Sequence, residues 1–281
     1  MTFTEQLASA ARRNDTLLCV GLDPEPARFP GAWKGDASRI LDFCSAIVDA
    51  TKDLVLAFKP QIAHFAAHRA EPQLERLIAH IHDATPGVPV ILDAKRGDVG
   101  STAEFYAREA FERYRADAVT LSPFMGHDSI APYLAYEGKG AILLCRTSNP
   151  GGGDLQGLRL AGDGQEPGEL LYERIARLAA GPWNRGGQLG LVVGATYPAE
   201  IERVRALAPA LPLLIPGIGA QGGDAEATVR AGARDGAPII VSSSRAILYA
   251  GSGDDFAAAA RRAAEATKAV LNAAKPAPIR R

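Results

Sequence analysis

Charged residues that could do chemistry stand in two short segments, AFKPQ with Lys59 and LDAKRGD with Asp93, Lys95 and Asp98. Asp93 and Lys95 are two positions apart, so both side chains point to the same side of an extended segment. Carboxylates and ammonium groups that leave water must pair with one another, which predicts an alternating network of these four groups. An isolated Asp-x-Lys is more often a structural ion pair than a site, so its meaning depends on where the fold places it.

The glycine-rich segment PGIGAQGGD, residues 216–224, offers many backbone N–H groups just before a predicted helix. Such amides attract an anion together with the helix dipole, and Gln221 and Arg245 can add further donors to a phosphate. A plain tight turn is the structural alternative. Residues 217–222, GIGAQG, also fit the dinucleotide fingerprint, but that fold needs an acidic residue at the end of the next strand. Here that strand ends in SSSR, 242–245, which favours a phosphate site instead.

Eight short apolar runs alternate with amphipathic segments, and this alternation predicts a parallel sheet covered by helices. The runs are 17–22, 54–58, 88–92, 118–121, 141–145, 189–193, 213–215 and 239–241. The amphipathic segments include 36–50, 73–84, 101–114, 199–207 and 256–271. We therefore expect an α/β fold, a (β/α)8 TIM barrel, as a single domain over residues 1–281 with a frayed tail at about 274–281.

A barrel of this kind builds its site from residues at the carboxyl ends of the strands. Polar residues follow most of the predicted strands: Asp23, Lys59, Asp93 with Lys95, Thr147 with Ser148, the glycine-rich segment, and Ser244 with Arg245. They should converge on one rim, which favours an active site over a structural ion-pair cluster. The loop 147–167 is long and glycine-rich for a connection between strand and helix, which predicts a mobile cover.

Composition excludes several partners. The chain carries 31 Lys and Arg against 32 Asp and Glu, a net charge of −1, so no positive field is available for nucleic acid or an anionic membrane. No apolar stretch approaches the ~18 residues that span a bilayer, and the N-terminus lacks the apolar core of a signal peptide. A small-molecule partner is expected.

Histidines and cysteines give no metal site. His64 and His68 have the i, i+4 spacing of a helical metal pair, but neither a third ligand nor a zinc motif accompanies them. Cys19, Cys44 and Cys145 lie in apolar runs, as reduced core cysteines do, which fits a cytoplasmic protein.

The combination of motifs resembles the orotidine 5'-monophosphate decarboxylase family, particularly its longer bacterial subgroup, over nearly the whole chain. The matching segments are VGLDP at 20–24, FKPQ at 58–61, LDAKRGDVGST at 92–102, SPFMGHDS at 122–129, TSNPGGGD at 147–154, PGIGAQGGD at 216–224 and SSSRAILYA at 242–250. The resemblance implies decarboxylation of orotidine 5'-monophosphate (OMP) to UMP in de novo pyrimidine biosynthesis, without metal or cofactor.

The resemblance also implies roles for the charged residues. Lys59, Asp93, Lys95 and Asp98 match the catalytic tetrad, in which Lys95 stabilises a carbanion at C6 and protonates it. Asp93 would lie near the departing carboxylate, either repelling it or positioning Lys95. Asp98 and Thr102 would reach into the site of a neighbouring subunit, which implies a homodimer.

The remaining implied roles concern substrate binding. Asp23 and Lys59 would hold the ribose hydroxyls, and Ser148 would contact the pyrimidine edge. The phosphate would be held by Gln221, Arg245 and the backbone amide of Ser244. Binding of the remote phosphate would drive closure of the glycine-rich loops.

Two other functions fit the barrel less well. A Mg²⁺-dependent sugar-phosphate decarboxylase or aldolase would need an acidic metal ligand after the second strand, where Lys59 stands and would repel the ion. A non-catalytic nucleotide-binding barrel would be expected to have lost a member of the tetrad, and all four are present.

Overall fold

The computed structural model describes residues 1–162, 168–218, 224–233 and 238–276. Within them, eight parallel strands form one sheet in the order β2-β1-β8-β7-β6-β5-β4-β3. Two isolated parallel bridges, Phe58 with Val90 and Gln61 with Asp93, join β2 to β3 and close the ring. The predicted α/β (β/α)8 TIM barrel is confirmed. The strands are β1 (Leu18–Leu22), β2 (Ala57–Pro60), β3 (Ile91–Arg96), β4 (Ala118–Leu121), β5 (Gly140–Arg146), β6 (Leu189–Val193), β7 (Leu213–Pro216) and β8 (Ile239–Ser243).

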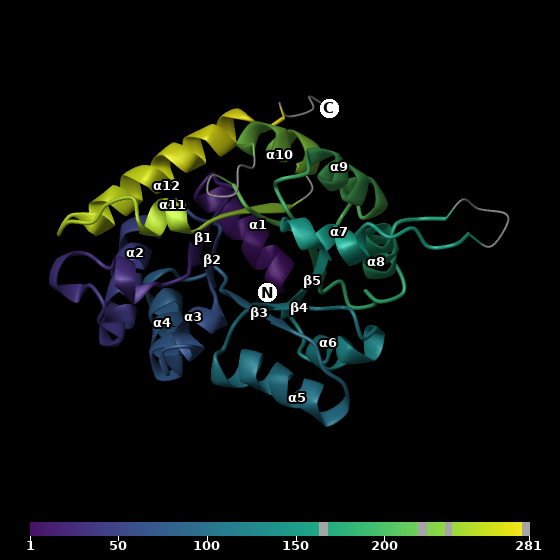
Figure 1. Ribbon diagram of the computed structural model, residues 1–281, viewed down its shortest axis with the longest axis horizontal. Coiled ribbons are helices and arrows are strands. Elements are labelled where there is room, and N and C mark those ends of the chain that lie inside the picture. The colour runs from purple at the N-terminus through teal and green to yellow at the C-terminus, as the bar shows by residue number, and fades with distance from the viewer. Residues whose placement is uncertain (163–167, 219–223, 234–237, 277–281) are drawn as a thin grey trace.

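Helices surround the strands on the outside (Figure 1). The α-helices are α1 (Phe3–Arg13), α2 (Ile40–Thr51), α3 (Ile62–Ala66), α4 (Glu71–Ala84), α5 (Gly100–Arg108), α6 (Ala131–Leu134), α7 (Gly153–Gln156), α8 (Leu171–Ala180), α9 (Pro198–Leu207), α10 (Ala225–Gly232), α11 (Arg245–Leu248) and α12 (Phe256–Ala273). Short 3₁₀ turns are η1 (Pro26–Arg28), η2 (Gly31–Trp33), η3 (Ala37–Arg39), η5 (His127–Ser129) and η6 (Pro150–Gly152), and η4 (Glu109–Arg113) is a π-helical turn. The longer helices turn one apolar stripe toward the barrel: α2, for example, buries Ile40, Phe43 and Ile47.

All eight predicted strands are present, but two of them are displaced along the chain. β2 and β3 each begin three residues later than expected, at Ala57 and Ile91 instead of 54 and 88. They also continue through charged residues, as far as Pro60 and Arg96. The predicted boundaries of β2 and β3 were too early because they followed the last apolar residue, whereas the strands continue through Lys59, Asp93 and Lys95, whose side chains face a cavity.

The amino-terminal end of the barrel is closed by α1, which lies across the middle of the ring in Figure 1. A capping box begins this helix: Thr2 Oγ1 accepts from the Glu5 amide at 3.3 Å, and the Thr2 amide donates to the Glu5 carboxylate at 2.7 Å. The Phe3 ring is buried against Gly140 at the start of β5, where a Cβ on Gly140 would collide with it. The polar groups that could form a site must therefore lie at the opposite end of the barrel, where the carboxyl ends of the strands meet.

No helix among the described residues is long and apolar enough to cross a membrane. All three cysteines are free and buried. Of the expected tail at 274–281, the structure describes the first part, in which Lys275 forms an ion pair with Asp15 at 2.8 Å; residues 277–281 lie outside the described residues.

Candidate active site

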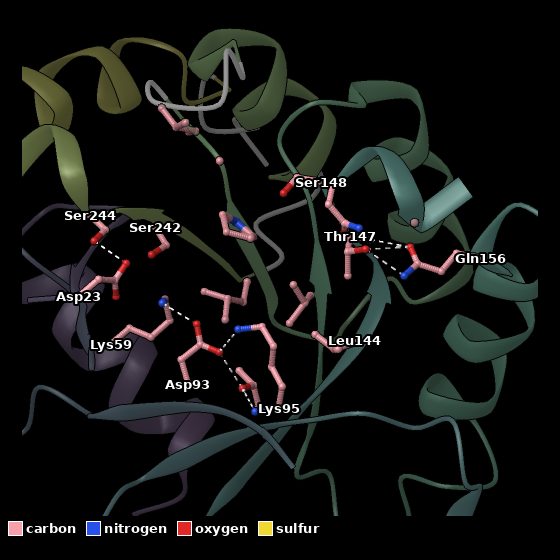
Figure 2. Close-up of a pocket in the computed structure, with 18 of the residues that line it drawn as sticks. Asp23, Lys59, Asp93, Lys95, Leu144, Thr147, Ser148, Gln156, Ser242 and Ser244 are labelled. Carbon is pink, nitrogen blue, oxygen red and sulfur yellow. Dashed lines mark hydrogen bonds and ion pairs between the residues drawn. The ribbon is translucent and has the colours of Figure 1, made fainter. Parts of the chain in front are cut away.

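A cavity of about 500 Å³ opens at the carboxyl ends of the strands (Figure 2). Seven of the residues predicted to form the site line it: Asp23, Lys59, Asp93, Lys95, Ser148, Ser244 and Arg245. They come from β2 and β3 and from the segments that follow β1, β5 and β8. Convergence of these strand ends on one rim is what a parallel barrel imposes, so residues far apart in sequence share one cavity.

Asp93 lies between two lysines at the floor of the cavity. Lys59 Nζ is 2.8 Å from Asp93 Oδ2, and Lys95 Nζ is 2.6 Å from Oδ1, so each carboxylate oxygen has its own ammonium group (Figure 2). Lys59 and Asp93 are only 5% and 7% exposed, whereas the Lys95 side chain is 47% exposed and projects into the cavity. Of the two lysines, Lys95 is thus the one whose ammonium group is accessible to a bound molecule.

The charges hold one another in the ionised state. Burial alone would raise the pKa of Asp93, but the positive charges of Lys59 and Lys95 outweigh it and hold that pKa well below its usual range. Burial would likewise lower the pKa of Lys59, but the carboxylates of Asp93 and Asp23 raise it above its ordinary value. The Asp93 carboxylate and the Lys59 ammonium group therefore hold each other in the charged state.

The backbone reaches this arrangement through a bulge in β3. Between the pairs Leu92 with Val119 and Arg96 with Leu121, the register shifts, so that three residues of β3 face one residue of β4. Lys95 has φ of +49°, a left-handed conformation that is uncommon for a residue with a side chain. Asp93 and Lys95 do meet, as predicted, but by this bulge and not by the regular alternation of an extended strand.

Asp23 and Ser244 face each other across the seam between β1 and β8. Ser244 Oγ donates to Asp23 Oδ2 at 2.6 Å, while Asp23 Oδ1 has no hydrogen-bond partner in the part of the chain that is described. Gly21 permits this approach, because a Cβ there would lie 2.8 Å from the Cβ of Ser244. The second carboxylate oxygen of Asp23 is thus a buried acceptor whose hydrogen-bonding capacity is unused in the described part of the chain.

Ser148 lies on the other side of the cavity, after β5 (Figure 2). Its backbone passes so close to Gly194 that a Cβ on Gly194 would lie 2.7 Å from the Ser148 backbone. The neighbouring Thr147 is tied to Gln156 of α7: Gln156 Oε1 accepts from the Thr147 amide at 2.8 Å, and Gln156 Nε2 donates to Thr147 Oγ1 at 2.9 Å. These bonds fasten α7, which lies within the glycine-rich loop, to the residue that follows β5.

The predicted phosphate region is described only in part. Pro216 at the end of β7 lines the cavity, as do Gly217 and Ile218 after it, and Gly217 has φ of +103°, which favours glycine. Gln221 lies outside the described residues. Arg245 begins α11 with an exposed side chain on the same rim. A cation and a turn of backbone therefore lie at one end of the cavity.

Asp98 and Thr102 are not brought into this cavity within one chain. The Asp98 carboxylate accepts from the Val99 amide at 2.8 Å, and it has no ion pair among the described residues. Thr102 lies on a separate surface depression beside Phe105. The predicted tetrad is therefore a triad of Lys59, Asp93 and Lys95 in the single chain.

The histidine pair does not form a helical metal site. α3 ends at Ala66, so His68 lies beyond the helix, and His64 Nδ1 is 3.1 Å from the carbonyl oxygen of Pro24. Across the residues that the structure describes, no group of three or more His, Cys, Asp and Glu is arranged to hold a metal ion.

Several residues that line the cavity were not predicted from the sequence. Thr120 of β4 lies under Asp93 and Lys95, and Gln156 comes from the loop over Ser148. The apolar wall includes Leu144, Val192, Leu214 and Ile218. Thr120 was the one polar residue in the run AVTL, which was the available signal; the apolar residues look like ordinary strand core.

Known proteins resemble this chain along most of its length. The sequence model described as the orotidine 5'-phosphate decarboxylase / HUMPS family matches residues 16–263. A protein named orotidine 5'-phosphate decarboxylase from Polaromonas naphthalenivorans (strain CJ2) is 75% identical over 275 residues, covering 98% of this chain and 97% of its own length. One of the same name from Variovorax paradoxus (strain S110) is 74% identical, covering 98% of this chain and 100% of its own.

A solved structure agrees with the sequence relatives. The OMP decarboxylase of Leishmania donovani is 40% identical to this chain, with a TM-score of 0.82 over 96% of this chain and 99% of its own. Similarity at this level extends to the whole barrel and not to one motif. The chain belongs to the orotidine 5'-phosphate decarboxylase / HUMPS family.

Proposed function

We propose that this chain decarboxylates OMP to UMP in pyrimidine biosynthesis, with Lys95 as the group that stabilises and protonates C6. The observation that carries the proposal is the Lys59–Asp93–Lys95 triad at the floor of a cavity of about 500 Å³. That volume lies within the range of small-molecule sites. The activity is the one named for relatives at 75% and 74% identity.

The chemistry requires a cation beside the reacting carbon. When the bond from C6 to the carboxylate breaks, carbon dioxide leaves and the electron pair stays on C6 in the plane of the ring. A preorganised ammonium group stabilises this charge, because it does not have to reorganise as the charge develops. Lys95 then transfers a proton to C6 and recovers one from solvent. Its exposed side chain, anchored to Asp93 at 2.6 Å, fits both steps.

Asp93 can contribute in two ways. It fixes the position of Lys95, and it places a negative charge close to where the substrate carboxylate would lie. Burial alone would raise the pKa of Asp93, but the positive charges of Lys59 and Lys95 outweigh it and lower that pKa, which supports an ionised group in either role.

The other lining residues fit the parts of a nucleotide. We assign the ribose hydroxyls to Asp23 and Lys59, since Asp23 Oδ1 has no partner in the described part of the protein. Ser148 is assigned to the pyrimidine edge. Arg245, the Ser244 amide and Gln221 are assigned to the phosphate.

The glycine-rich loop is assigned the role of a cover. Leu155 lines the cavity and Leu158 lies just after α7, and both are exposed. Binding energy from the phosphate would drive the loop onto the substrate and expel water from the site. The two exposed leucines would then gain an apolar contact.

We also propose a homodimer in which Asp98 and Thr102 reach the partner's cavity. We propose that four exposed apolar side chains from α5 and from the segments that follow β3 and β4, namely Val99, Phe105, Phe124 and Met125, form one apolar patch near them. Phe124 is 79% and Phe105 64% exposed, and large apolar side chains gathered in this way mark interaction surfaces. Pairing through this patch would bring Asp98 beside the triad of another chain and complete the tetrad.

The setting of the reaction follows from the same features. Three buried free thiols fit the reducing cytoplasm, where we expect the enzyme to act as one domain over residues 1–281.

The test is the ultraviolet change that accompanies loss of OMP, followed with purified protein in the presence of EDTA. We expect rapid conversion, with UMP and carbon dioxide formed in equal amounts. A folded protein that binds UMP without converting OMP would contradict the proposal and favour a binding barrel. Activity that is lost in EDTA and restored by Mg²⁺ would instead favour a metal-dependent sugar-phosphate enzyme.

A further inference from the structure

The seam between β3 and β4 contains a polar group that the proposed mechanism does not use. Three residues of β3, numbers 93–95, face only Thr120 of β4, because the regular pairing stops at Leu92 with Val119 and resumes at Arg96 with Leu121. A bulge of this kind interrupts the ladder of backbone hydrogen bonds. Thr120 is 1% exposed and stands where the ladder is interrupted.

The Thr120 hydroxyl accepts hydrogen bonds from backbone amides of the bulge. The amides of Ala94 and Lys95 both donate to Thr120 Oγ1, each at 3.0 Å. Buried backbone amides need an acceptor, and here one side-chain oxygen serves two consecutive residues. Lys95 is the residue with φ of +49°, so its amide is held in a conformation that a regular strand would not give it.

The same hydroxyl also orients the carboxylate. Thr120 Oγ1 donates to Asp93 Oδ1 at 2.9 Å, and that oxygen is the one that Lys95 Nζ contacts at 2.6 Å. A hydroxyl has one donor and two acceptor positions, and all three are occupied by neighbours within the active-site segment 93–95. Every hydrogen bond of Thr120 Oγ1 therefore acts on the residues that carry the proposed chemistry.

We propose that Thr120 is a positioning residue that sets the place of Lys95 Nζ from two sides, through the backbone of Lys95 and through Asp93 Oδ1. This inference rests on the proposed function, since it concerns the rate at which the site acts on OMP. Thr120 acts on the reaction through Asp93 and Lys95 and is not proposed to contact the substrate. Loss of the hydroxyl lets the bulge relax and the ammonium group move, which lowers the rate of chemistry more than the affinity for product.

The test compares Thr120→Val, which keeps the shape but removes the hydroxyl, with Thr120→Ser, which keeps the hydroxyl. Thr51→Val is the matched control, because Thr51 is a buried threonine whose hydroxyl donates at 2.7 Å to Ile47 O in α2, outside the residues that line the cavity. The single-turnover rate constant with OMP and the Kd for UMP are measured for each, alongside urea unfolding.

For Thr120→Val we expect the rate constant to fall about 10- to 100-fold, the effect of losing hydrogen bonds to a charged site. The Kd for UMP should stay within about threefold, because UMP lacks the carboxylate that the triad faces. Thr120→Ser should recover the rate to within about fivefold of the wild type, and Thr51→Val should leave it unchanged.

A folded Thr120→Val with the rate of the wild type would overturn the proposal, and so would a Thr120→Ser as slow as the valine variant. A lower stability without a slower single turnover would show a merely structural role and would also overturn it. If Thr120→Val does not fold, Thr120→Ala takes its place with the same expected loss and the same refuting result. A wild-type protein that leaves OMP unchanged would instead refute the proposed function itself.

Discussion

Replacing Asp93 by asparagine should destabilise the folded protein, because it leaves a buried lysine without its anion. Lys59 is 5% exposed, and its Nζ contacts Asp93 Oδ2 at 2.8 Å. An asparagine has one acceptor oxygen where aspartate has two, so it cannot serve Lys59 and Lys95 together. Whichever way the amide turns, its NH₂ group faces an ammonium group or the Thr120 hydroxyl.

The size of the effect follows from the burial of the two pairs. Removing one partner of a buried ion pair costs about 3–5 kcal/mol in the free energy of unfolding. The pair with Lys95 adds little, since that side chain is 47% exposed and exposed pairs contribute about 1 kcal/mol or less. Asp23 also lies near enough to raise the pKa of Lys59 and offsets part of the loss. We therefore expect about 3 kcal/mol, the lower end of the range for buried pairs.

The assay is urea unfolding at pH 7, with Asp42→Asn as the control. Asp42 forms an exposed ion pair with Arg39 at 2.8 Å, so its loss should cost less than about 1 kcal/mol. A loss for Asp93→Asn no larger than that of the control would refute the reasoning, because it would mean that Lys59 does not depend on Asp93.

The difference between wild type and Asp93→Asn should also depend on pH in a defined direction. The pKa of Asp93 is lowered in the folded state, where Lys59 and Lys95 outweigh the effect of burial. The stabilisation is therefore complete above the unfolded pKa of about 4 and declines as pH falls below it, when the unfolded aspartate binds a proton first. Unfolding curves between pH 7 and pH 3 should show a constant difference down to about pH 4.5 and a narrowing one below. A difference that grows toward acid would contradict this.

Three further variants test other parts of the site. Arg245→Ala should lower kcat/KM for OMP at least about 100-fold more than for orotidine, which lacks the phosphate, and equal losses would refute the phosphate role. Ser244→Ala removes the 2.6 Å bond to Asp23 and should lower kcat/KM for OMP about tenfold, whereas an unchanged value would mean that Asp23 holds its place unaided. Phe105→Glu places a charge in the exposed apolar patch and should shift sedimentation from dimer to monomer; a dimer that persists would exclude this surface.

Much of the fold could be predicted from periodicity alone. Every strand contains an apolar run, because strands covered by helices are buried on both faces. The ends of β2 and β3 could not be found this way, since Lys59 and Asp93 are polar residues inside strands. These two residues are polar because their side chains face the cavity. The cavity itself is formed only when the strands are arranged in the ring.

The site residues at strand ends could be predicted, because the topology of a parallel barrel brings those ends together on one rim. Asp23, Lys59 and Ser148 line one cavity because each is at or just beyond a carboxyl end. Thr120 stands out in the run AVTL only as its one polar residue, whereas its role depends on a register shift that opposes it to three residues of β3. The sequence of the run AVTL carries no sign of that shift.

The position of Asp98 shows a different limit. The alternating pattern of LDAKRGD suggested one network, but the chain leaves the strand at Arg96, and Asp98 turns to the amide of Val99. The sequence pattern therefore does not distinguish a carboxylate that faces the cavity of its own chain from one that does not.

The most direct test of the account is the single-turnover rate of Lys95→Ala with OMP, measured together with UMP binding. Lys139→Ala is the matched control, because Lys139 pairs with Asp117 at 3.3 Å at the amino-terminal end of the barrel. We predict that Lys95→Ala loses about 10⁴-fold or more in rate, the combined effect of a lost proton donor and a lost charge, while UMP still binds and the control keeps its activity. A folded Lys95→Ala within tenfold of the wild-type rate would contradict the assignment of Lys95 as the group that protonates C6.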